Sequence, residues 1–351
     1  MREFVQRHRQ SVIYVIMAVV IAVVANFLPR GFDYLRVFSP HLVPVFFVPW
    51  TDGLLYLLPW PILVSITIMA LIIAVQRNGG SKWLIPLVIF SLPTIWVLFL
   101  GALEGVTLAG LLLLRYALPV RLIEGITKRN RRWWIVMLLL GIVTVLAAVI
   151  IGAVQGQHYH FANSTELGRQ PIVGLAMAVL LPWIMPLILL RPQLAGFALL
   201  ARRNWFIVGA VWLALSIVIW GWWPPNLLLK VAPELKVAQP QNVSLFPWSI
   251  VFVLPMLWWS QKDPDMLMAA GSFIAPSVIP YYYMVLMPSL ARLPVKYAML
   301  CWASSFLPLT ANYFGPAWWL TGNVFPLMIW LGLWQQRKFA RPPAATMWSP
   351  V

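Results

Sequence analysis

Long runs of apolar residues recur along almost the whole of this 351-residue sequence. A helix needs about 20 mostly apolar residues to cross the hydrocarbon core of a membrane. Only 10% of the residues are charged, against about 25% in soluble domains. The sequence therefore excludes a soluble globular enzyme and predicts an all-α fold, a polytopic transmembrane helix bundle. Candidate crossings lie at 11–29, 54–76, 83–100, 133–154, 171–190, 205–223 and 317–335, with shorter ones at 102–120, 247–260 and 297–313.

The basic residues predict how this bundle is oriented. Lys and Arg collect in the cytoplasmic loops of membrane proteins. With a cytoplasmic N-terminus, 20 of the 25 basic residues fall inside and 5 fall outside. The excess of basic over acidic residues is thus typical of loop charge, and we expect no nucleic-acid partner. The inner segments would be the N-terminal residues, 77–82, 115–132, 191–203, 261–265, 292–296 and the tail from 336.

The segment 266–291 decides the number of crossings. It contains Pro276 and Pro280, and each proline removes a helix hydrogen bond and disfavours the helical turn before it. We therefore expect a break near these prolines, facing protein or a wet cavity. If the segment enters and returns, the charge split holds, and the chain crosses ten to twelve times with both termini cytoplasmic. A single span over 266–291 would give eleven crossings and a smaller excess of basic residues on the cytoplasmic side. Residues 1–351 would form a single integral membrane domain, with no soluble domain.

Carboxylates on the predicted outer face indicate where chemistry could occur. Asp33, Asp52 and Glu104 stand at the ends of apolar runs. A charge at a membrane face is costly unless it is paired or hydrated, so its presence favours a functional role. The alternative is an interfacial carboxylate that pairs with Arg30 or Arg36. Asp263 and Asp265, on the inner side next to basic residues, are typical of solvated loop charge.

Metal and cofactor chemistry has little support in the sequence. His158 and His160 lie in a polar loop with Glu166 and could bind a divalent metal, but spare imidazoles in a loop are commoner. The sequence has no HExxH, Walker A, CxxC or GxSxG motif, which argues against zinc proteases and ATP-driven pumps. The lone Cys301 excludes an internal disulfide. We predict no metal site and no cofactor.

Three stretches carry a resemblance to a known family. They are GFDYLRVF at 31–38, LLRPQLAGFALLARR at 189–203 and APSVIPYYYMVLMPSLARLP at 275–294. Together they resemble family 87 of the GT-C superfamily, the polytopic glycosyltransferases that use polyprenyl-phosphate sugars. The resemblance implies transfer of a sugar from such a donor to an acceptor on the outer face. It implies Asp33 as general base, because a carboxylate within reach can take the proton of an acceptor hydroxyl.

The remaining candidate residues would bind the substrates. Arg36 or Arg191 could stabilise the phosphate leaving group, although the charge-based topology puts Arg191 on the inner face. The full set of candidate substrate-binding residues is Arg36, Asp52, Glu104, His158, His160, Arg191, Gln193, Tyr281 and Tyr282.

Two other functions stay open at the level of sequence. The chain could be a non-catalytic polytopic subunit, a scaffold whose partners are other membrane subunits, because Trp is frequent and mid-span charges are rare. It could also be a lipid or small-molecule permease, although ion coupling would favour charges at the bilayer midplane. In each case we expect a multi-pass protein of the cell membrane, in a prokaryotic inner or plasma membrane, with membrane lipid as a partner.

Overall fold

The computed structural model describes residues 9–35, 48, 50–51, 58–116, 185–220, 223–226 and 240–339. Within these ranges every regular element is a helix, so the predicted all-α class is confirmed for the described part of the chain. The α-helices are α2 (Arg9–Ala25), α4 (Trp60–Arg77), α5 (Leu84–Ile89), α6 (Leu92–Leu100), α7 (Glu104–Tyr116), α12 (Met185–Ile188), α13 (Pro192–Ala198), α14 (Arg203–Trp220), α15 (Trp223–Asn226), α17 (Ile250–Ser260), α18 (Pro264–Ile274), α19 (Val295–Ser304), α20 (Ala311–Phe314) and α21 (Val324–Phe339). The 3₁₀ helices are η4 (Leu199–Ala201), η6 (Pro280–Arg292), η7 (Leu307–Thr310) and η8 (Pro316–Asn323).

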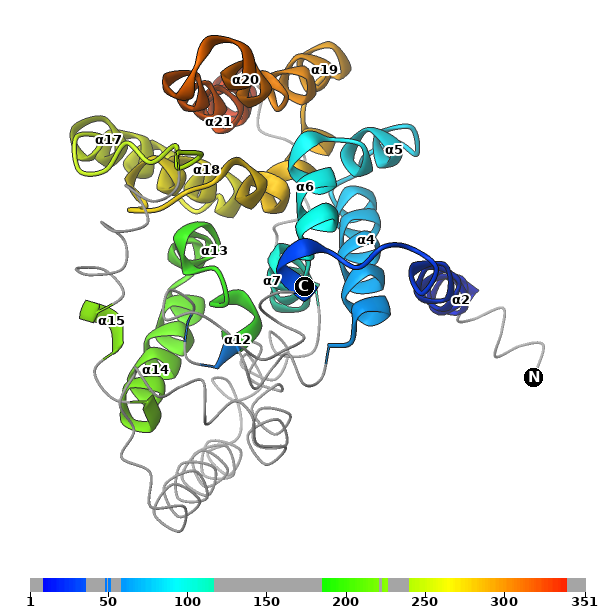
Figure 1. The fold of residues 1–351 in the computed structure, drawn as a ribbon. Coiled ribbons are helices and arrows are strands. Elements are labelled where there is room, and N and C mark those ends of the chain that lie inside the picture. The colour runs from blue at the N-terminus through cyan, green and yellow to red at the C-terminus, as the bar shows by residue number, and fades with distance from the viewer. Residues whose placement is uncertain are drawn as a thin grey trace.

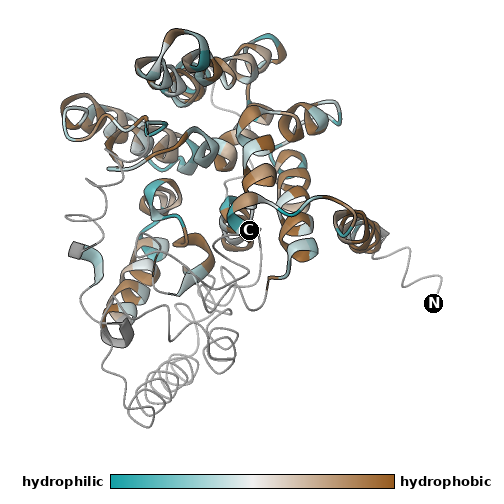
Figure 2. Ribbon diagram, in the orientation of Figure 1, coloured by the Kyte–Doolittle hydropathy of each residue, from teal (hydrophilic) through white to brown (hydrophobic). Residues whose placement is uncertain are grey.

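The helices pack around α18 and η6, whose residues are almost all buried. Figure 1 shows α13 on one side of α18 and α21 on the other, while α4 and α7 lie side by side and α2 packs on the outer side of α4. Apolar residues cover much of α2, α4 and α14, as Figure 2 shows. The apolar core is therefore continuous across the described helices, and many apolar side chains of α2 also face outward.

Prolines cut the apolar runs into short helices. Pro61, Pro93, Pro192, Pro264 and Pro280 each stand in the first turn of a helix, where the missing N–H costs nothing. Inside a longer helix each would remove a hydrogen bond. Proline therefore sets several of the helix starts.

The short helices bear on the predicted number of crossings. In the part of the chain that the structure describes, α4 is long and apolar enough to cross a membrane, and the pair α6 and α7, bent by 115°, would add a second if it counts as one span. Core helices of soluble proteins can be equally long and apolar. The ten to twelve crossings expected from the apolar runs are therefore not supported by the described helices, because those runs are divided at prolines and at Gly101.

The predicted break in 266–291 is confirmed. The helix α18 ends at Ile274, residues 275–279 are not helical, with extended backbone at Ala275 and Ile279, and η6 begins at Pro280. Nearly every residue from 275 to 290 is buried. The hairpin of α18 and η6 therefore turns back inside the protein and brings Arg292 close to Asp265, near which it began.

Close helix contact at two glycines fixes the arrangement around this hairpin. A Cβ at Gly105 would overlap the Thr67 side chain, so α7 lies directly on α4 at this point. A Cβ at Gly271 would overlap the ring of Phe197, so α13 lies equally close to α18. These contacts set α7 on α4 and α13 on the hairpin helix α18.

Candidate functional site

The two ends of α7 each hold a group of charged side chains. Glu104 begins this helix and Arg115 lies 11 residues later. At 1.5 Å per residue, the two positions are about 16 Å apart along the helix axis. The two groups are thus separate sites, and each collects residues from distant parts of the sequence.

The group at Glu104 is called the Asp33–Arg191 cluster below, and it comprises Asp33, Glu104, Arg191, Tyr281 and Tyr282. The Nε atom of Arg191 lies 2.8 Å from Oε1 of Glu104, and both side chains are almost fully buried. The guanidinium carbon lies 4.9 Å from the centre of the Tyr282 ring, and Nη1 donates a hydrogen bond of 3.4 Å to the Tyr282 hydroxyl. Arg191 is therefore held by a carboxylate and by an aromatic face.

Tyr281 and Tyr282 form one wall of the cluster. They begin η6, and their ring centres lie 4.8 Å apart in an edge-to-face arrangement. Edge-to-face packing is a favoured geometry for aromatic pairs. The two tyrosines follow Pro280 in the first turn of η6, and both side chains are buried. They therefore lie at the turn of the hairpin, far from Arg292 at its open end.

Asp33 reaches the cluster through an unusual backbone contact. A Cβ at Gly31 would overlap the backbone of Gly101, the residue that follows α6. Gly101 has φ of 75°, in the left-handed region that favours glycine. The Tyr34 hydroxyl accepts a hydrogen bond of 2.8 Å from the backbone N–H of Trp60. Two glycines and one tyrosine therefore hold the segment 31–35 against the helix start at Glu104.

The electrostatics of Asp33 differ from those of a surface carboxylate. Its side chain is half-buried. Burial raises the pKa of Asp33, and the positive charge of Arg191 opposes this shift without cancelling it. A carboxylate with a raised pKa holds a proton more readily than a free one, which suits a group that accepts and releases protons.

Two acceptor atoms of this region are among the buried side-chain atoms that have no hydrogen bond to any described residue. They are Oε2 of Glu104 and Oε1 of Gln193, which lies two residues after Arg191. A buried acceptor left without a donor costs about 1–3 kcal/mol, so such groups are commonly satisfied by water or by a ligand. Both atoms are acceptors, so the group that satisfies them has to be a hydrogen-bond donor, such as a hydroxyl or an N–H.

The structure thus brings together residues that the sequence could nominate only one by one. Glu104, Arg191 and Tyr282 are in contact, Tyr281 packs on Tyr282, and Asp33 lies near enough for its charge to act on Arg191 and Glu104. Gln193 follows Arg191 by two residues in the sequence. The candidates Arg36, Asp52, His158 and His160 lie outside the described residues.

One feature of the predicted topology is wrong. The loop charges assigned Glu104 to the outer face and Arg191 to the inner face. Their 2.8 Å ion pair excludes opposite faces of a membrane. The physical reason is that a buried carboxylate needs a cation, and this local requirement outweighs the general bias of basic residues toward the inside.

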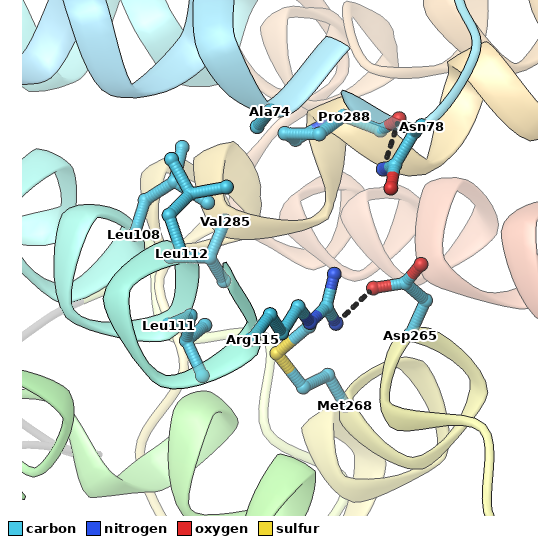
Figure 3. Close-up of a pocket in the computed structure, with 10 residues that line it drawn as sticks. All are labelled: Ala74, Asn78, Leu108, Leu111, Leu112, Arg115, Asp265, Met268, Val285 and Pro288. Carbon is cyan, nitrogen blue, oxygen red and sulfur yellow. Dashed lines mark hydrogen bonds and ion pairs between the residues drawn. The ribbon is translucent and has the colours of Figure 1, made fainter. Parts of the chain in front are cut away.

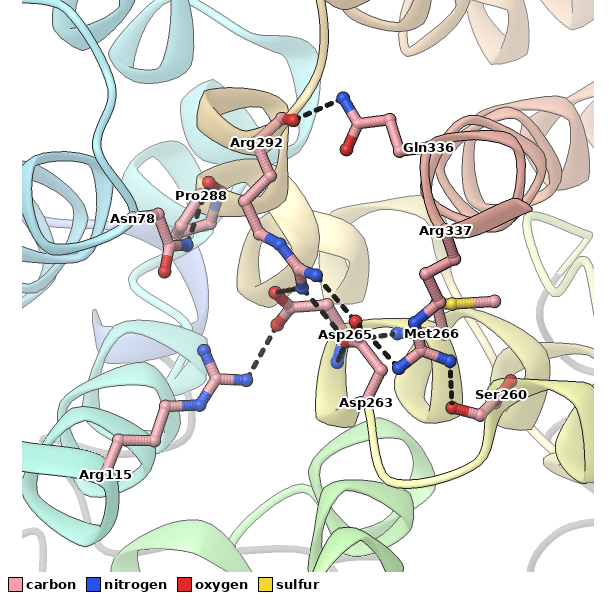
Figure 4. A network of polar contacts seen from close by, with 10 residues as sticks. All are labelled: Asn78, Arg115, Ser260, Asp263, Asp265, Met266, Pro288, Arg292, Gln336 and Arg337. Atoms are coloured by element: carbon pink, nitrogen blue, oxygen red, sulfur yellow. Dashed lines mark hydrogen bonds and ion pairs between the residues drawn. The ribbon is translucent and has the colours of Figure 1, made fainter. Parts of the chain in front are cut away.

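The group at the other end of α7 is larger and is called the basal network. It comprises Asn78, Arg115, Ser260, Asp263, Asp265, Arg292, Gln336 and Arg337 (Figure 4). Arg292 contacts Asp263 at 2.6 Å and Asp265 at 2.7 Å, and Arg115 contacts Asp265 at 2.7 Å. Charge-assisted contacts of this length are strong ones. They join the end of α7 to both arms of the hairpin.

Hydrogen bonds extend this network to the ends of three more helices. Asn78, after α4, donates to the Pro288 carbonyl, and Gln336 in α21 donates to the Arg292 carbonyl. Arg337 donates to the Ser260 carbonyl at the end of α17. Residues from five of the loops predicted to be cytoplasmic thus belong to one network, while the prediction that these loops are cytoplasmic stays a prediction.

Sequence reasoning missed the role of two network residues. Asp263 and Asp265 were expected to be solvated loop charges, but they are 5% and 2% exposed. Asp263 caps α18, with its side chain accepting hydrogen bonds from the backbone N–H groups of Asp265 and Met266. The local signal was Asp263-Pro264-Asp265, because Asp followed by Pro is typical of a helix start.

A small cavity lies beside Arg115 and Asp265 (Figure 3). Its volume of about 10 Å³ is roughly that of one water-sized sphere. Its other walls are mainly apolar side chains of α4, α7 and η6. This cavity is too small for any molecule larger than water.

No group of three or more His, Cys, Asp and Glu suited to hold a metal ion occurs among the described residues.

Comparison with known proteins finds no matching family model, curated protein or solved structure. The resemblance to GT-C family 87 therefore stays a prediction, and the function has to be argued from the site itself.

Proposed function

We propose that this chain is an integral membrane glycosyltransferase that moves a sugar from a polyprenyl-phosphate donor to an acceptor hydroxyl. The observation that carries the proposal is the arrangement of three residues from distant segments, in which Arg191 contacts Tyr282 and the charge of Arg191 acts on Asp33. It places a carboxylate with a raised pKa near a fixed cation and an aromatic wall. These are the groups that transfer from a sugar phosphate requires.

The chemistry assigns one step to each group. The Asp33 carboxylate takes the proton of the acceptor hydroxyl as its oxygen bonds to the anomeric carbon of the sugar. The bond from that carbon to the donor phosphate breaks, and the polyprenyl phosphate leaves as an anion. The Arg191 guanidinium stabilises the negative charge that develops on this phosphate. Tyr281 and Tyr282 provide the wall against which the sugar ring packs.

Glu104 has a supporting part in this proposal. Its ion pair with Arg191 and the Tyr282 ring on another side fix the direction of the guanidinium. A cation held in place before the reaction stabilises developing charge without the cost of reorganising. Glu104 is thus a positioning residue, since it acts through Arg191.

The membrane location is supported by apolar surface. Phe27, at the end of α2, is 86% exposed, and Val251 in α17 is 82% exposed. Apolar side chains along both helices are exposed as well, over surfaces that no described helix covers. Contiguous apolar surface of this kind favours contact with lipid or with another membrane protein. A polytopic arrangement in the cell membrane is therefore part of the proposal.

The test is a transfer assay with purified, full-length protein in lipid and radiolabelled polyprenyl-phosphate hexoses. Wild-type protein should transfer the sugar to a lipid-linked acceptor, and Asp33→Asn should remove nearly all transfer. Arg30→Gln is the matched control, because Arg30 is an exposed charged residue three positions away. No transfer by the wild type with any polyprenyl-phosphate sugar would contradict the proposal.

A non-catalytic subunit is the second candidate, and the ion pair of Glu104 and Arg191 favours it. A buried ion pair can have a purely structural role, in which it fixes how helices pack. In that case the chain would copurify with other membrane subunits, and Asp33→Asn would change neither its assembly nor its stability. No contact among the described residues favours a permease over these two functions.

A further inference from the structure

The end of the molecule that holds the basal network also carries exposed cations. Each lies within four residues of a network member, and together they are Arg77, Lys82, Lys262, Lys296, Arg337 and Lys338. The described part of the chain contains four acidic residues. Asp263 and Asp265 are buried here and already paired with Arg292, whereas Asp33 and Glu104 lie in the other cluster. The described exposed charge of this end is therefore entirely basic.

Contacts place these cations near one another. The turn before Lys82 packs on the end of η6, since a Cβ at Gly80 would lie 2.7 Å from Cβ of Ala291. Lys262 directly precedes Asp263, which binds Arg292, and Lys296 follows Arg292 by four residues. Each of the three lysines is therefore within four residues of Arg292 or of a residue that packs beside it.

Tryptophans stand beside the lysines at this end. Trp83 follows Lys82 and is exposed, and the neighbours of Lys262 in α17 are the exposed Trp258 and Trp259. The ammonium group of Lys338 lies 5.2 Å from the centre of the Trp334 ring. Indole rings prefer the headgroup level of a bilayer, and lysines near helix ends reach to the same level. Exposed Trp beside exposed Lys therefore matches a lipid surface in its chemistry.

We propose that this basic end binds the headgroup phosphates of anionic phospholipids, with Lys82, Lys262 and Lys296 as the main contacts. The proposal rests on the membrane location given above and does not depend on sugar transfer. An ammonium group near an anionic leaflet gains enough free energy to change lipid affinity about fivefold. Phosphatidylcholine gains little, because its own choline balances its phosphate.

The experiment uses full-length protein reconstituted in phosphatidylcholine bilayers. Spin-labelled phosphatidylglycerol and spin-labelled phosphatidylcholine are added separately, and electron spin resonance gives the fraction of each that is immobilised at the protein. We expect a several-fold preference for phosphatidylglycerol at low salt. It should weaken at high salt, because exposed charges are screened.

Variants assign the preference to the three lysines. Replacing Lys82, Lys262 and Lys296 together by Gln should remove most of it, and replacing the same three by Arg should retain it. Lys262→Gln alone should lower it, which keeps the test usable if the triple variant does not reconstitute. Arg30→Gln should leave it unchanged, because Arg30 lies near Gly101 at the other end of α7.

Three outcomes separate this proposal from the one on sugar transfer. Equal association of both lipids with the wild type, or an undiminished preference in the Gln variant, would overturn the lipid site. Failure of the chain to enter bilayers would overturn the membrane location and both proposals with it. Absence of sugar transfer together with a phosphatidylglycerol preference would overturn only the enzyme proposal.

Discussion

The Arg292 guanidinium lies 2.6 Å from the Asp263 carboxylate, so the last residue of η6 is bonded to the residue that caps α18. The same guanidinium also reaches Asp265 at 2.7 Å. One side chain therefore ties the two arms of the buried hairpin together at its open end. The other end of the hairpin carries Tyr281 and Tyr282, and Tyr282 contacts Arg191 there.

Loss of this side chain should destabilise the protein strongly. Arg292→Met removes the cation that two buried carboxylates share, and breaking a buried ion pair from one side costs about 3–5 kcal/mol. Arg337→Gln is the control, because Arg337 is more exposed and its contact with Asp263 is longer, at 3.4 Å. Thermal unfolding in detergent, followed by tryptophan fluorescence, should show a large fall in Tm for the first variant and a small one for the second. Equal falls would mean that Arg292 is not the main link.

Asp265 predicts how stability depends on pH. Burial alone would raise the pKa of Asp265, but the charges of Arg115 and Arg292 outweigh burial and lower this pKa to about 2. A folded-state pKa below the unfolded value of about 3.9 means that ionised Asp265 stabilises the fold. This contribution is fully present above about pH 4 and is lost as the pH falls toward 2. Unfolding of wild type and Asp265→Asn should be compared across this range, and the variant should show the weaker dependence on pH.

The hairpin is also where the sequence was most informative. Pro276 and Pro280 were enough to predict the break, because the chemistry of proline acts locally. The charges of Asp263 and Asp265 were misjudged, since burial depends on which cations arrive from α7 and η6. The sequence could nominate Asp33, Glu104 and Arg191 separately. Their meeting could not be predicted, because loop charge gave only an average orientation and assigned Glu104 and Arg191 to opposite faces.

The pairing of Glu104 with Arg191 can be measured by a double-mutant cycle. Glu104→Gln leaves a buried guanidinium without its carboxylate, and Arg191→Gln leaves a buried carboxylate without its guanidinium. Each single variant should therefore lower the free energy of unfolding by about 3–5 kcal/mol. The double variant should cost much less than the sum of the two, because no unpaired charge remains. Chemical denaturation of the four proteins gives the coupling free energy. Simple additivity would show that the two side chains do not interact in solution.

A pair of glycines tests the packing of α7 on α4. Gly105→Ala should destabilise by about 1–3 kcal/mol, because the new methyl group overlaps Thr67 and forces the helices apart. Gly196→Ala is the matched control within α13, where the nearest atoms lie 3.9 Å from the new Cβ. It should stabilise by about 0.5–1 kcal/mol, since Ala favours the helix more than Gly does. The two changes in Tm should have opposite signs, and the same sign would contradict this packing.

Asp33 is where stability and activity should respond in opposite ways. Burial raises the pKa of this carboxyl above its ordinary value, with Arg191 only partly opposing, so the charged form is unfavourable in the folded protein. Its contribution to stability is present at low pH and is lost as the pH rises through the raised pKa. Asp33→Asn should therefore leave Tm at pH 7 unchanged or slightly higher.

The same variant should lower sugar transfer by about 10²–10⁴-fold, because an amide cannot take the proton of the acceptor hydroxyl. In the wild type, transfer should rise with pH through a pKa above that of a free aspartate, since only ionised Asp33 acts as a base. Asp33→Glu should retain part of this activity and its pH profile. A folded Asp33→Asn protein that transfers sugar at the wild-type rate would exclude Asp33 as the base.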